Sequence, residues 1–404
     1  MEEHPQARQI IDTLTKAGFI AYYAGGWVRD YLLQHPSDDI DIATNAQPET
    51  IQALFPRTVP IGLAFGIILV LIDDHEYEVA TFRQDLDYQD GRRPSRVEFT
   101  SAIEDAKRRD FTINGMFYDP IKQEILDYVE GRKDLEKKVI RAIGNPHERI
   151  REDRLRMIRA IRLACRFKFT IEAATQEAIR AHAKEIFPAV AIERIVQELT
   201  KAHQFQVLKE MLIQLHSFDL LTPLFPHLKN MTLSTLKEHL APTENYPKEA
   251  PVISFLLTLF PSASLKEQQT LCKTLKLPNA DLEFVSFLFR AKNLIEKEKK
   301  HPRSVENFDF AYLYANPLIK TSLAILSAQA FTSLEEHTQR QQKLHKEILR
   351  IQDKNPVVKA DILIQYGISP GPTMGNLLRS AEKIAINEGI EDPLLILSKL
   401  GITT

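Results

Sequence analysis

The sequence predicts an α+β protein, with a small mixed β-sheet domain at the N-terminus and an all-helical remainder. Up to residue 140, short apolar stretches of strand length alternate with helical stretches. After residue 140, apolar residues such as Leu155, Ile158 and Ile161 recur at the spacing of an amphipathic helix. We therefore expect a head over residues 1–140, a helical neck over residues 141–204, and a helical body and tail over residues 205–404.

The head shows a regular order of short elements. Helices are predicted at Ala7–Lys16, Trp27–Leu33 and Pro48–Leu54, and strands at Ala21–Ala24, Ile40–Ala43, Gly66–Ile72 and Tyr77–Phe82. Apolar residues alternate on both sides of the polar turn Asp73–His75, which predicts an antiparallel hairpin. In the helical half, prolines recur at intervals that suit helices of medium length.

Composition excludes several classes of protein. The 404 residues include 52 Lys plus Arg and 54 Asp plus Glu, so a nucleic-acid partner has to be held by a local basic patch. Two cysteines, Cys165 and Cys272, are too few for a disulfide framework or a zinc ribbon, and they suit a reducing compartment. The N-terminus lacks a secretory signal pattern, and no apolar run reaches membrane-spanning length. We expect a cytoplasmic protein without a membrane partner.

Two glycines, Gly25 and Gly26, come immediately before the helix predicted at Trp27. Glycine lets the backbone approach a ligand closely, and a helix N-terminus offers free N–H groups and a positive dipole to a phosphate. Arg29, in the first turn of that helix, can add a two-pronged phosphate contact. The segment therefore predicts a phosphate site.

Paired carboxylates follow a few residues later. Because side chains alternate along a strand, Asp39 and Asp41 point to one face, while Ile40 and Ile42 anchor the other face in the core. Two carboxylates roughly 6–7 Å apart along a strand repel each other unless a cation lies between them. Mg²⁺ prefers one or two carboxylates together with substrate phosphates. A two-metal site of this kind activates an attacking hydroxyl and stabilises a leaving pyrophosphate.

Glu78 is a third candidate carboxylate, on the strand predicted at Tyr77–Phe82. It completes the metal site if this strand lies beside Ile40–Ala43. The alternative is that Glu78 pairs with a cation on a neighbouring strand.

These segments resemble a known family. GGWVRDYLL and SDDIDIAT resemble the first motif of the class II tRNA nucleotidyltransferases (CCA-adding enzymes) and the related bacterial poly(A) polymerases, in the polymerase-β-like nucleotidyltransferase superfamily. The resemblance continues in order through RRDFTIN, the hinge segment GRKDL, EDRLR and ERIVQE. It implies catalysis by Asp39 and Asp41 with Mg²⁺, and substrate contacts from Gly25, Gly26, Arg29, Arg108, Arg109, Asp110, Asn114, Asp153, Arg156, Arg159 and Arg162.

Asp153 and Arg156 of the EDRLR segment can read a base edge. We expect them three residues apart on one face of a helix. Arg can donate to O2 and N3 of cytosine or to N1 of adenine, and Asp can accept from either exocyclic amine. Uracil and guanine present a carbonyl there instead, which costs roughly 1–3 kcal/mol for the mispaired group. The resemblance implies this role; the spacing alone favours a surface ion pair.

The same predicted helix carries a basic cluster. Arg159, Arg162 and Arg166 follow at spacings of three and four residues and project from one side. They form a plausible track for triphosphate or RNA backbone, although their stems can also cover apolar surface.

Three activities share these motifs: full CCA addition, addition of part of that end, and poly(A) synthesis. The segment Arg83–Phe99 has the charges, Gly91 and Pro94 of a mobile loop rather than a packed element, which disfavours enzymes that add only CC. Ile61–Ile67 is more similar to the CCA-adding form than to the Arg-rich poly(A) form. Gly115 stands where the family usually has Ala or Ser, and predicts looser packing beneath motif RRDFTIN.

We therefore expect addition of C and A to the 3′ end of tRNA from CTP and ATP, with no protein partner implied. An A-adding enzyme and a poly(A) polymerase remain alternatives. A rival of another class is an RNA-binding relative without activity, which has no reason to keep two mutually repelling carboxylates.

Overall fold

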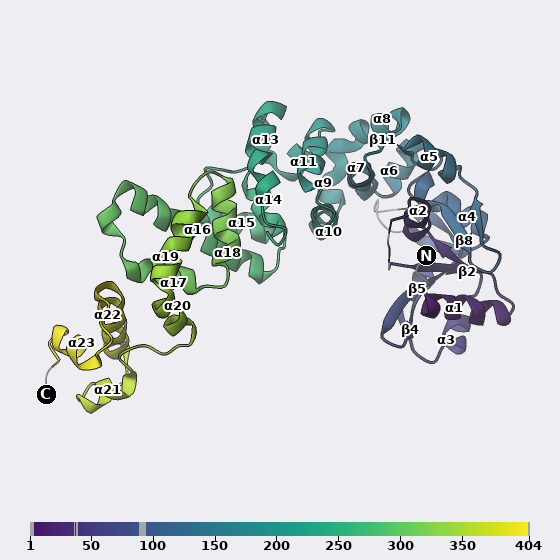
Figure 1. The fold of residues 1–404 in the computed structure, drawn as a ribbon. Coiled ribbons are helices and arrows are strands. Elements are labelled where there is room, and N and C mark those ends of the chain that lie inside the picture. Colours follow the sequence, from purple (N-terminus) through teal and green to yellow (C-terminus); the bar gives the residue numbers. More distant parts are fainter. Residues whose placement is uncertain (1–3, 36, 38, 89–93, 403–404) are drawn as a thin grey trace. The chain divides into compact units, whose positions relative to one another are not determined.

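The computed structural model describes residues 4–35, 37, 39–88 and 94–402 (Figure 1). The chain forms two compact units, Met1–Ser234 and Thr235–Thr404. The first unit opens with a mixed β-sheet and continues in helices, and the second unit is helical throughout its described residues. The predicted α+β class is thus confirmed.

The head is built on a seven-stranded sheet with the order β3-β4-β5-β2-β1-β8-β9. Strands β2 and β5 run parallel, and the other neighbouring pairs run antiparallel. The strands are β1 (Ala21–Ala24), β2 (Asp41–Thr44), β3 (Thr58–Gly62), β4 (Ile67–Ile72), β5 (His75–Thr81), β8 (Met116–Asp119) and β9 (Glu124–Asp127). The predicted hairpin is confirmed as β4 and β5, paired from Ile67 with Ala80 to Ile72 with His75.

Three strands of this seven-stranded sheet were not predicted, namely β3, β8 and β9. Strand β3 lies at the sheet edge and its central residues are exposed, so it lacks the apolar alternation of a half-buried strand. Strands β8 and β9 are only four residues long each.

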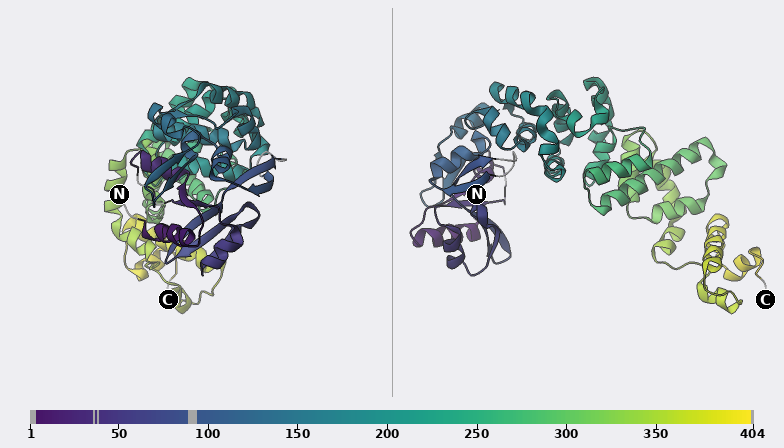
Figure 2. Two further views of the ribbon diagram at one scale, coloured as in Figure 1. Left: turned by 90° about the vertical axis from the view of Figure 1, so that its right-hand side faces the viewer. Right: turned by 180° about the vertical axis from the view of Figure 1, so that it is seen from behind.

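Helices cover both faces of the sheet (Figure 2). Helices α1 and α3 pack against each other and against β1, β2 and β4. Helix α4 packs on the opposite side over Phe82 and Phe117, whose rings meet edge to face at 5.8 Å. The head helices are α1 (Pro5–Lys16), α2 (Gly26–Leu32), α3 (Pro48–Leu54), α4 (Ala102–Arg108) and α5 (Gly131–Lys137), with short turns of 3-10 helix η1 (Leu63–Phe65) and η2 (Thr112–Asn114).

The expected irregular loop at Arg83–Phe99 forms a separate two-stranded antiparallel sheet instead, of β6 (Arg83–Tyr88) and β7 (Pro94–Phe99). Its turn, with Gly91, lies outside the described residues. Charged residues predominate in this segment, which is why a loop was predicted there.

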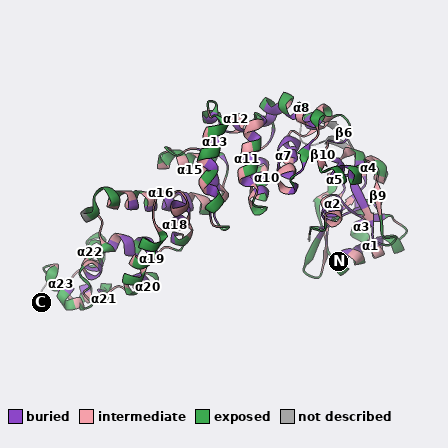
Figure 3. Cartoon of the chain, turned by 45° about the horizontal axis from the view of Figure 1, so that its top comes forward, coloured by how far each residue is buried: buried purple, intermediate pink, exposed green. Residues whose placement is uncertain are grey.

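Near the start of the helical part of the first unit, two helices are separated by a short non-helical break. Helix α6 ends at Glu152, Asp153 is extended with φ −146°, and α7 begins at Leu155. Leu155, Ile158 and Ile161 of α7 are buried as predicted, and buried residues are purple in Figure 3. The elements of this part are β10 (Val139–Ile140), α6 (Pro146–Glu152), α7 (Leu155–Phe167), β11 (Thr170–Ile171), α8 (Ala173–His182), η3 (Ala183–Glu185), α9 (Ile186–Ala189), α10 (Ile192–Gln204), α11 (Leu208–Ser217), α12 (Leu221–Leu224) and η4 (Pro226–Leu228).

The second unit consists of helices in its described residues. Helix α13 (Leu233–Leu240) leads into it. The C-terminal helices bury their own cluster, which includes Leu363, Ile396 and Leu397. The elements are η5 (Ala241–Asn245), α14 (Val252–Leu257), α15 (Leu265–Thr274), α16 (Asn279–Lys300), η6 (Pro302–Ser304), α17 (Asn307–Ala315), α18 (Ile319–Ala328), α19 (Leu334–Lys343), α20 (His345–Gln352), α21 (Ala360–Gln365), α22 (Pro372–Glu388) and α23 (Pro393–Lys399). Among the helices of the described chain, none combines the length and the apolar character needed to cross a bilayer.

Candidate active site

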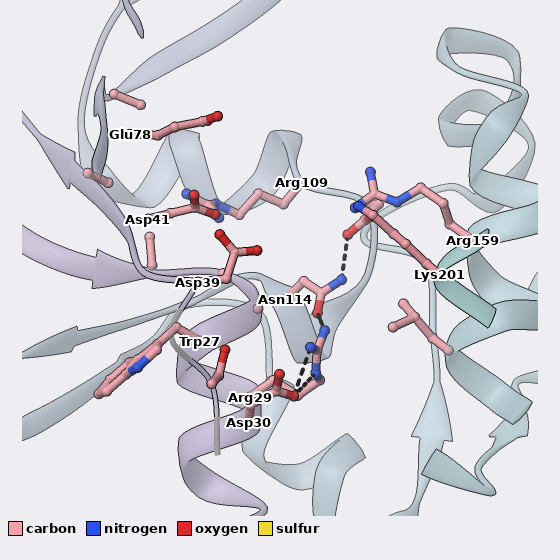
Figure 4. Close-up of a pocket in the computed structure, with 18 of the residues that line it drawn as sticks. Trp27, Arg29, Asp30, Asp39, Asp41, Glu78, Arg109, Asn114, Arg159 and Lys201 are labelled. Atoms are coloured by element: carbon pink, nitrogen blue, oxygen red, sulfur yellow. Dashed lines mark hydrogen bonds and ion pairs between the residues drawn. The ribbon is translucent and has the colours of Figure 1, made fainter. Parts of the chain in front are cut away.

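One pocket of about 780 Å³ in the first unit gathers every residue that the sequence singled out for chemistry (Figure 4). It lies where the sheet meets the helices that follow it. Asp39, Asp41, Glu78 and Arg109 gather on its sheet side, opposite Arg159. The expected site residues that line it are Gly25, Gly26, Arg29, Asp39, Asp41, Glu78, Arg108, Arg109, Asp110, Asn114, Asp153, Arg156, Arg159 and Arg162.

The carboxylates lie on adjacent strands. Strand β2 begins at Asp41, so Asp39 precedes the strand rather than lying within it, while Ile40 and Ile42 are buried as expected. Strands β2 and β5 are parallel neighbours with Ile42 opposite Val79, which places Asp41 next to Glu78. Glu78 therefore lies on a strand next to β2, which is the condition under which it could complete the metal site.

The charges in this corner oppose ionisation of Asp41. Desolvation by the pocket walls raises the pKa of Asp41 to about 6, with the negative charges of Asp39 and Glu78 as further causes. Arg109 and Arg159 oppose the rise. A bound cation would relieve this repulsion, as expected for a metal site.

The donor set fits a hard cation that is also held by a substrate. Among the described residues, no group of three or more His, Cys, Asp or Glu side chains is arranged to hold a metal ion by itself. Two carboxylates with room for phosphate oxygens and water match the habits of Mg²⁺, which rarely takes an all-protein shell. Asp39 and Asp41 are the residues that would hold it.

The glycine turn before α2 is needed for close packing. Gly25 has φ +67°, which favours glycine, and a Cβ there would lie 2.8 Å from Nη1 of Arg109 and 3.8 Å from Oδ2 of Asp41. A side chain at this position would therefore displace the arginine that faces the carboxylates.

Arg108 and Arg109 are held together by Asp105, a residue that the sequence analysis did not identify. One carboxylate oxygen of Asp105 accepts from Nε and Nη2 of Arg108 at 2.8 and 2.7 Å. The other accepts from Nε and Nη2 of Arg109 at 3.2 and 3.0 Å. The spacing of three and four residues along α4 is the signal that could have found this cluster.

A buried hydrogen-bonded chain connects α2 with the RRDFTIN segment. Arg29 is 5% exposed, binds Asp30, and donates from Nη1 to Oδ1 of Asn114 at 2.6 Å. Asn114 donates to Asp110 at 3.0 Å, and Asp110 pairs with Arg159 at 3.0 Å. Arg29 thus supports the site through Asn114, and the direct phosphate contact expected of it stays a prediction.

Asp153 and Arg156 do not share one helix, which corrects the prediction. Asp153 lies in the break between α6 and α7, and only Arg156 belongs to α7. The break was not predicted because the four residues between Ile150 and Leu155 are all charged, so no apolar residue there indicates where one helix ends and the next begins. Both residues still line the pocket, since the extended backbone of Asp153 turns the chain.

Each of these two residues is fixed by protein partners. Arg194 of α10 donates to both carboxylate oxygens of Asp153. Arg156 donates to Glu152 at 2.7 Å and to the main-chain oxygens of residues 149 and 108. The ERIVQE segment was recognised as a motif, but nothing in its own spacing indicated a partner in EDRLR.

The basic side of α7 lines the pocket as predicted, but each arginine also has an acidic partner. Arg162 pairs with Glu198 of the ERIVQE segment at 2.5 Å, and both side chains are buried. Arg166 pairs with Asp30 at 3.1 Å and its guanidinium lies 3.8 Å from the ring centroid of Phe205. These partners leave fewer donors for a ligand than a solvated basic track would.

The predicted loose packing at Gly115 is not found. A Cβ at this position would lie 2.6 Å from Cγ2 of Val129 and 3.0 Å from Cδ1 of Ile143. The neighbouring side chains fill the space that an alanine methyl group would need.

Comparison with known proteins finds family models that match three parts of the chain. A family model described as "Poly A polymerase head domain" matches residues 21–141. Models described as "Probable RNA and SrmB- binding site of polymerase A" and "tRNA nucleotidyltransferase domain 2 putative" match residues 168–232 and 246–397. The head model covers most of the pocket residues on the sheet side.

Solved structures share the fold. A Bacillus stearothermophilus CCA-adding enzyme in complex with CTP aligns over 99% of this chain and 98% of its own, with a TM-score of 0.80 and 24% identity. A Thermotoga maritima CCA-adding enzyme complexed with tRNA aligns over 97% of this chain and 93% of its own, with a TM-score of 0.65 and 21% identity.

Curated relatives are more similar in sequence. A CCA-adding enzyme of Streptococcus mutans is 34% identical over 95% of this chain and 93% of its own length. One of Streptococcus pyogenes serotype M4 is 33% identical over 96% and 94%. At this identity over nearly the full length, with the motif residues gathered in one pocket, the chain belongs to the CCA-adding enzyme family of nucleotidyltransferases.

Proposed function

We propose that this chain adds C and A to the 3′ end of tRNA from CTP and ATP, with release of pyrophosphate and with Mg²⁺ as the metal. The observation that carries the proposal is the single pocket, in which Asp39 and Asp41 face Arg109 while Asp153 and Arg156 line the same space. The two curated relatives described above, 34% and 33% identical, are CCA-adding enzymes. CCA-adding enzymes solved with CTP, with tRNA and with ATP have the same fold.

The sheet side of the pocket serves the triphosphate and the attacking hydroxyl. Asp39 and Asp41 would hold Mg²⁺, which lowers the pKa of a bound hydroxyl and screens phosphate charge. Arg108 and Arg109 direct positive charge toward the phosphates, and Gly25 lets the backbone come close to them. Position and charge are the main contributions a protein makes to transfer at an α-phosphate.

The helical side of the pocket serves the base. Asp153 accepts from the exocyclic amine of cytosine or adenine, and Arg156 donates to the ring acceptors. Because uracil and guanine present a carbonyl to Asp153, the pair selects C and A without a nucleic-acid template. Arg159, Arg162, Asp110 and Asn114 line the space between the base and the sheet side.

Each region of the chain has a part in this proposal. We assign catalysis to residues 1–140, base recognition to residues 141–204, and tRNA binding to residues 205–404. RNA duplex is gripped mainly by shape and by phosphate and 2′-hydroxyl contacts, which suits a helical region without a separate catalytic motif.

An incorporation assay tests the proposal. The purified chain is given Mg²⁺ and labelled CTP or ATP with three RNAs: tRNA lacking CCA, tRNA ending in CC, and an unrelated RNA. We expect two C and then one A on the first tRNA. Addition of A to the CC end alone would indicate an A-adding enzyme, long A runs on any RNA a poly(A) polymerase, and no incorporation an inactive RNA-binding relative.

Asp41→Ala tests the metal assignment in the same assay. We expect incorporation to fall by far more than tenfold, because a metal-ligand carboxylate supplies several kcal/mol of transition-state stabilisation. Asp74→Ala is the matched control, since Asp74 is an exposed acid in the β4–β5 turn outside the pocket. Incorporation by Asp41→Ala at a tenth of wild type or more would show that the assignment is wrong.

A further inference from the structure

A buried carboxylate lies behind the two arginines that face the nucleotide site. Asp105 of α4 is 1% exposed. It does not line the pocket, but its two oxygens accept four side-chain donors, two from Arg108 and two from Arg109. One side chain therefore sets the orientation of both guanidinium groups.

The pairing with Asp105 leaves Nη1 of Arg109 available to donate to a ligand. Nε and Nη2 of Arg109 donate to Asp105, and among the described residues none accepts a hydrogen bond from its Nη1. Nη1 lies beside Gly25, close to the point that a Cβ on that residue would occupy, and Oδ2 of Asp41 also lies near this point. The side-on pairing thus directs Nη1 toward the phosphate site.

The charge balance of the group depends on Asp105. Two adjacent guanidinium groups repel each other, and a carboxylate between them offsets that repulsion. Burial by itself would raise the pKa of Asp105, but Arg109 and Arg108 hold it below its usual range. Asp105 is therefore ionised at neutral pH and its charge is available to hold the arginines.

Asp105 also connects the arginines to the β6–β7 hairpin. The main-chain N–H of Arg83, the first residue of β6, donates to Oδ1 of Asp105 at 3.2 Å. The same oxygen holds Arg108. The base of the hairpin and Arg108 are therefore held by the same oxygen atom, and Arg109 is held by the other oxygen of the same carboxylate.

We propose that Asp105 is a positioning residue for nucleotide binding, which keeps Arg108 and Arg109 on the triphosphate and away from the catalytic carboxylates. The proposal rests on the nucleotidyltransferase function proposed above. Without Asp105, Arg109 can turn to the nearby carboxylate of Asp41 and compete with the cation for it.

Two substitutions test the role of Asp105. Asp105→Asn keeps the shape and removes the charge, and Asp105→Glu keeps the charge and displaces it by one methylene. We expect Asp105→Asn to raise the KM for CTP and for ATP about tenfold or more, because hydrogen bonds to charged groups are the strong ones. Asp105→Glu should raise both KM values by less, and the KM for tRNA should change less than twofold in both variants.

A spectroscopic measurement separates positioning from a general loss of structure. In ¹⁵N-arginine-labelled protein, the Nε–H signals of Arg108 and Arg109 should be protected from solvent exchange in the wild type and lose that protection in Asp105→Asn. Asp119→Asn is the matched control, since Asp119 is a buried carboxylate at the end of β8, in the same unit and outside the pocket. Its two nucleotide KM values should equal those of the wild type.

The outcomes decide between the two proposals. A folded Asp105→Asn protein with both nucleotide KM values within twofold of wild type overturns the role of Asp105. Unchanged protection of both Nε–H groups in Asp105→Asn overturns it as well. If the wild type itself incorporates no nucleotide, the proposed function has failed, whereas nucleotide binding and arginine protection still report on Asp105.

Discussion

Arg194 donates from both terminal guanidinium nitrogens to the two carboxylate oxygens of Asp153, at 3.1 and 2.7 Å. The two residues are 41 positions apart, and Asp153 lies in an extended break between two helices. Oδ1 of Asp153 also accepts from the main-chain N–H of Leu155, the first residue of α7, at 3.1 Å. The side chain that we propose to read the base edge is therefore held from two sides, by the start of α7 and by the charge-assisted pair with α10.

Arg194→Ala should weaken base selection. Loss of the two-pronged pair releases Asp153, so we expect kcat/KM for CTP to fall about tenfold or more and the preference for CTP over UTP to shrink. Single-nucleotide incorporation with CTP, ATP, UTP and GTP measures both effects.

Arg154→Ala is the matched control for Arg194→Ala. Arg154 is a neighbouring arginine at the same break, but it pairs with Glu185 and does not line the pocket. Its nucleotide preference should equal that of the wild type. Unchanged selectivity in Arg194→Ala would contradict the role of the Asp153 pair.

Glu78→Gln tests the third carboxylate. Glu78 lines the pocket and contributes to the raised pKa of Asp41, so its charge reaches the proposed metal site. We expect kcat to fall about tenfold, equal to roughly 1.4 kcal/mol of activation free energy. Glu76→Gln changes the same strand two residues away and outside the pocket, and its kcat should match the wild type. Equal kcat values in the two variants would show that Glu78 does not contribute to catalysis.

Gly115→Ala should destabilise the first unit. The added methyl group meets Val129 at 2.6 Å and Ile143 at 3.0 Å, and overpacking of this kind costs about 1–3 kcal/mol of unfolding free energy. Gly375→Ala, in α22, meets nothing within 4 Å and should stabilise its own helix by up to about 1 kcal/mol. Urea unfolding of both variants against the wild type measures the contrast. If Gly115→Ala instead stabilised the protein, Val129 and Ile143 would have to move and make room for the methyl group.

The free energy of unfolding of the second unit should decrease at acidic pH because of His337. This imidazole is buried, and its ring nitrogens lie 2.7 Å from the hydroxyl of Tyr314 and 2.8 Å from that of Thr332. Burial, and then the positive charge of Arg340, lowers the pKa of His337 from its usual 6.5. Below about pH 6.5 the unfolded chain binds a proton that the folded chain does not, so the free energy of unfolding decreases as the pH falls.

Urea unfolding at pH 7.5, 6.0 and 5.0 measures this loss. His337→Asn removes the titrating group and should flatten the pH dependence relative to the wild type. His345→Asn, at an exposed position, should leave it unchanged. Identical pH slopes in the wild type and His337→Asn would show that His337 does not contribute.

Local signals in the sequence determined the α+β class, most of the central strands, and the order of chemical segments. Apolar alternation identified β4 and β5 because both have a buried face, and paired acids after a glycine turn identified the phosphate and metal chemistry. The family resemblance then implied the roles of Asp153 and Arg156, which their spacing alone did not.

Only the tertiary structure decided which residues support those that bind substrate. Arg194 and Glu198 pair with residues of other segments, and only the fold shows that Asp105 lies behind the pocket that its two arginines line. At Asp153, four consecutive charged residues conceal the break between the helices. Contacts between distant segments depend on how the elements pack, and local periodicity carries no record of that packing. Gly115 shows the same limit, because Val129 and Ile143 fill the space that its sequence context suggested was open.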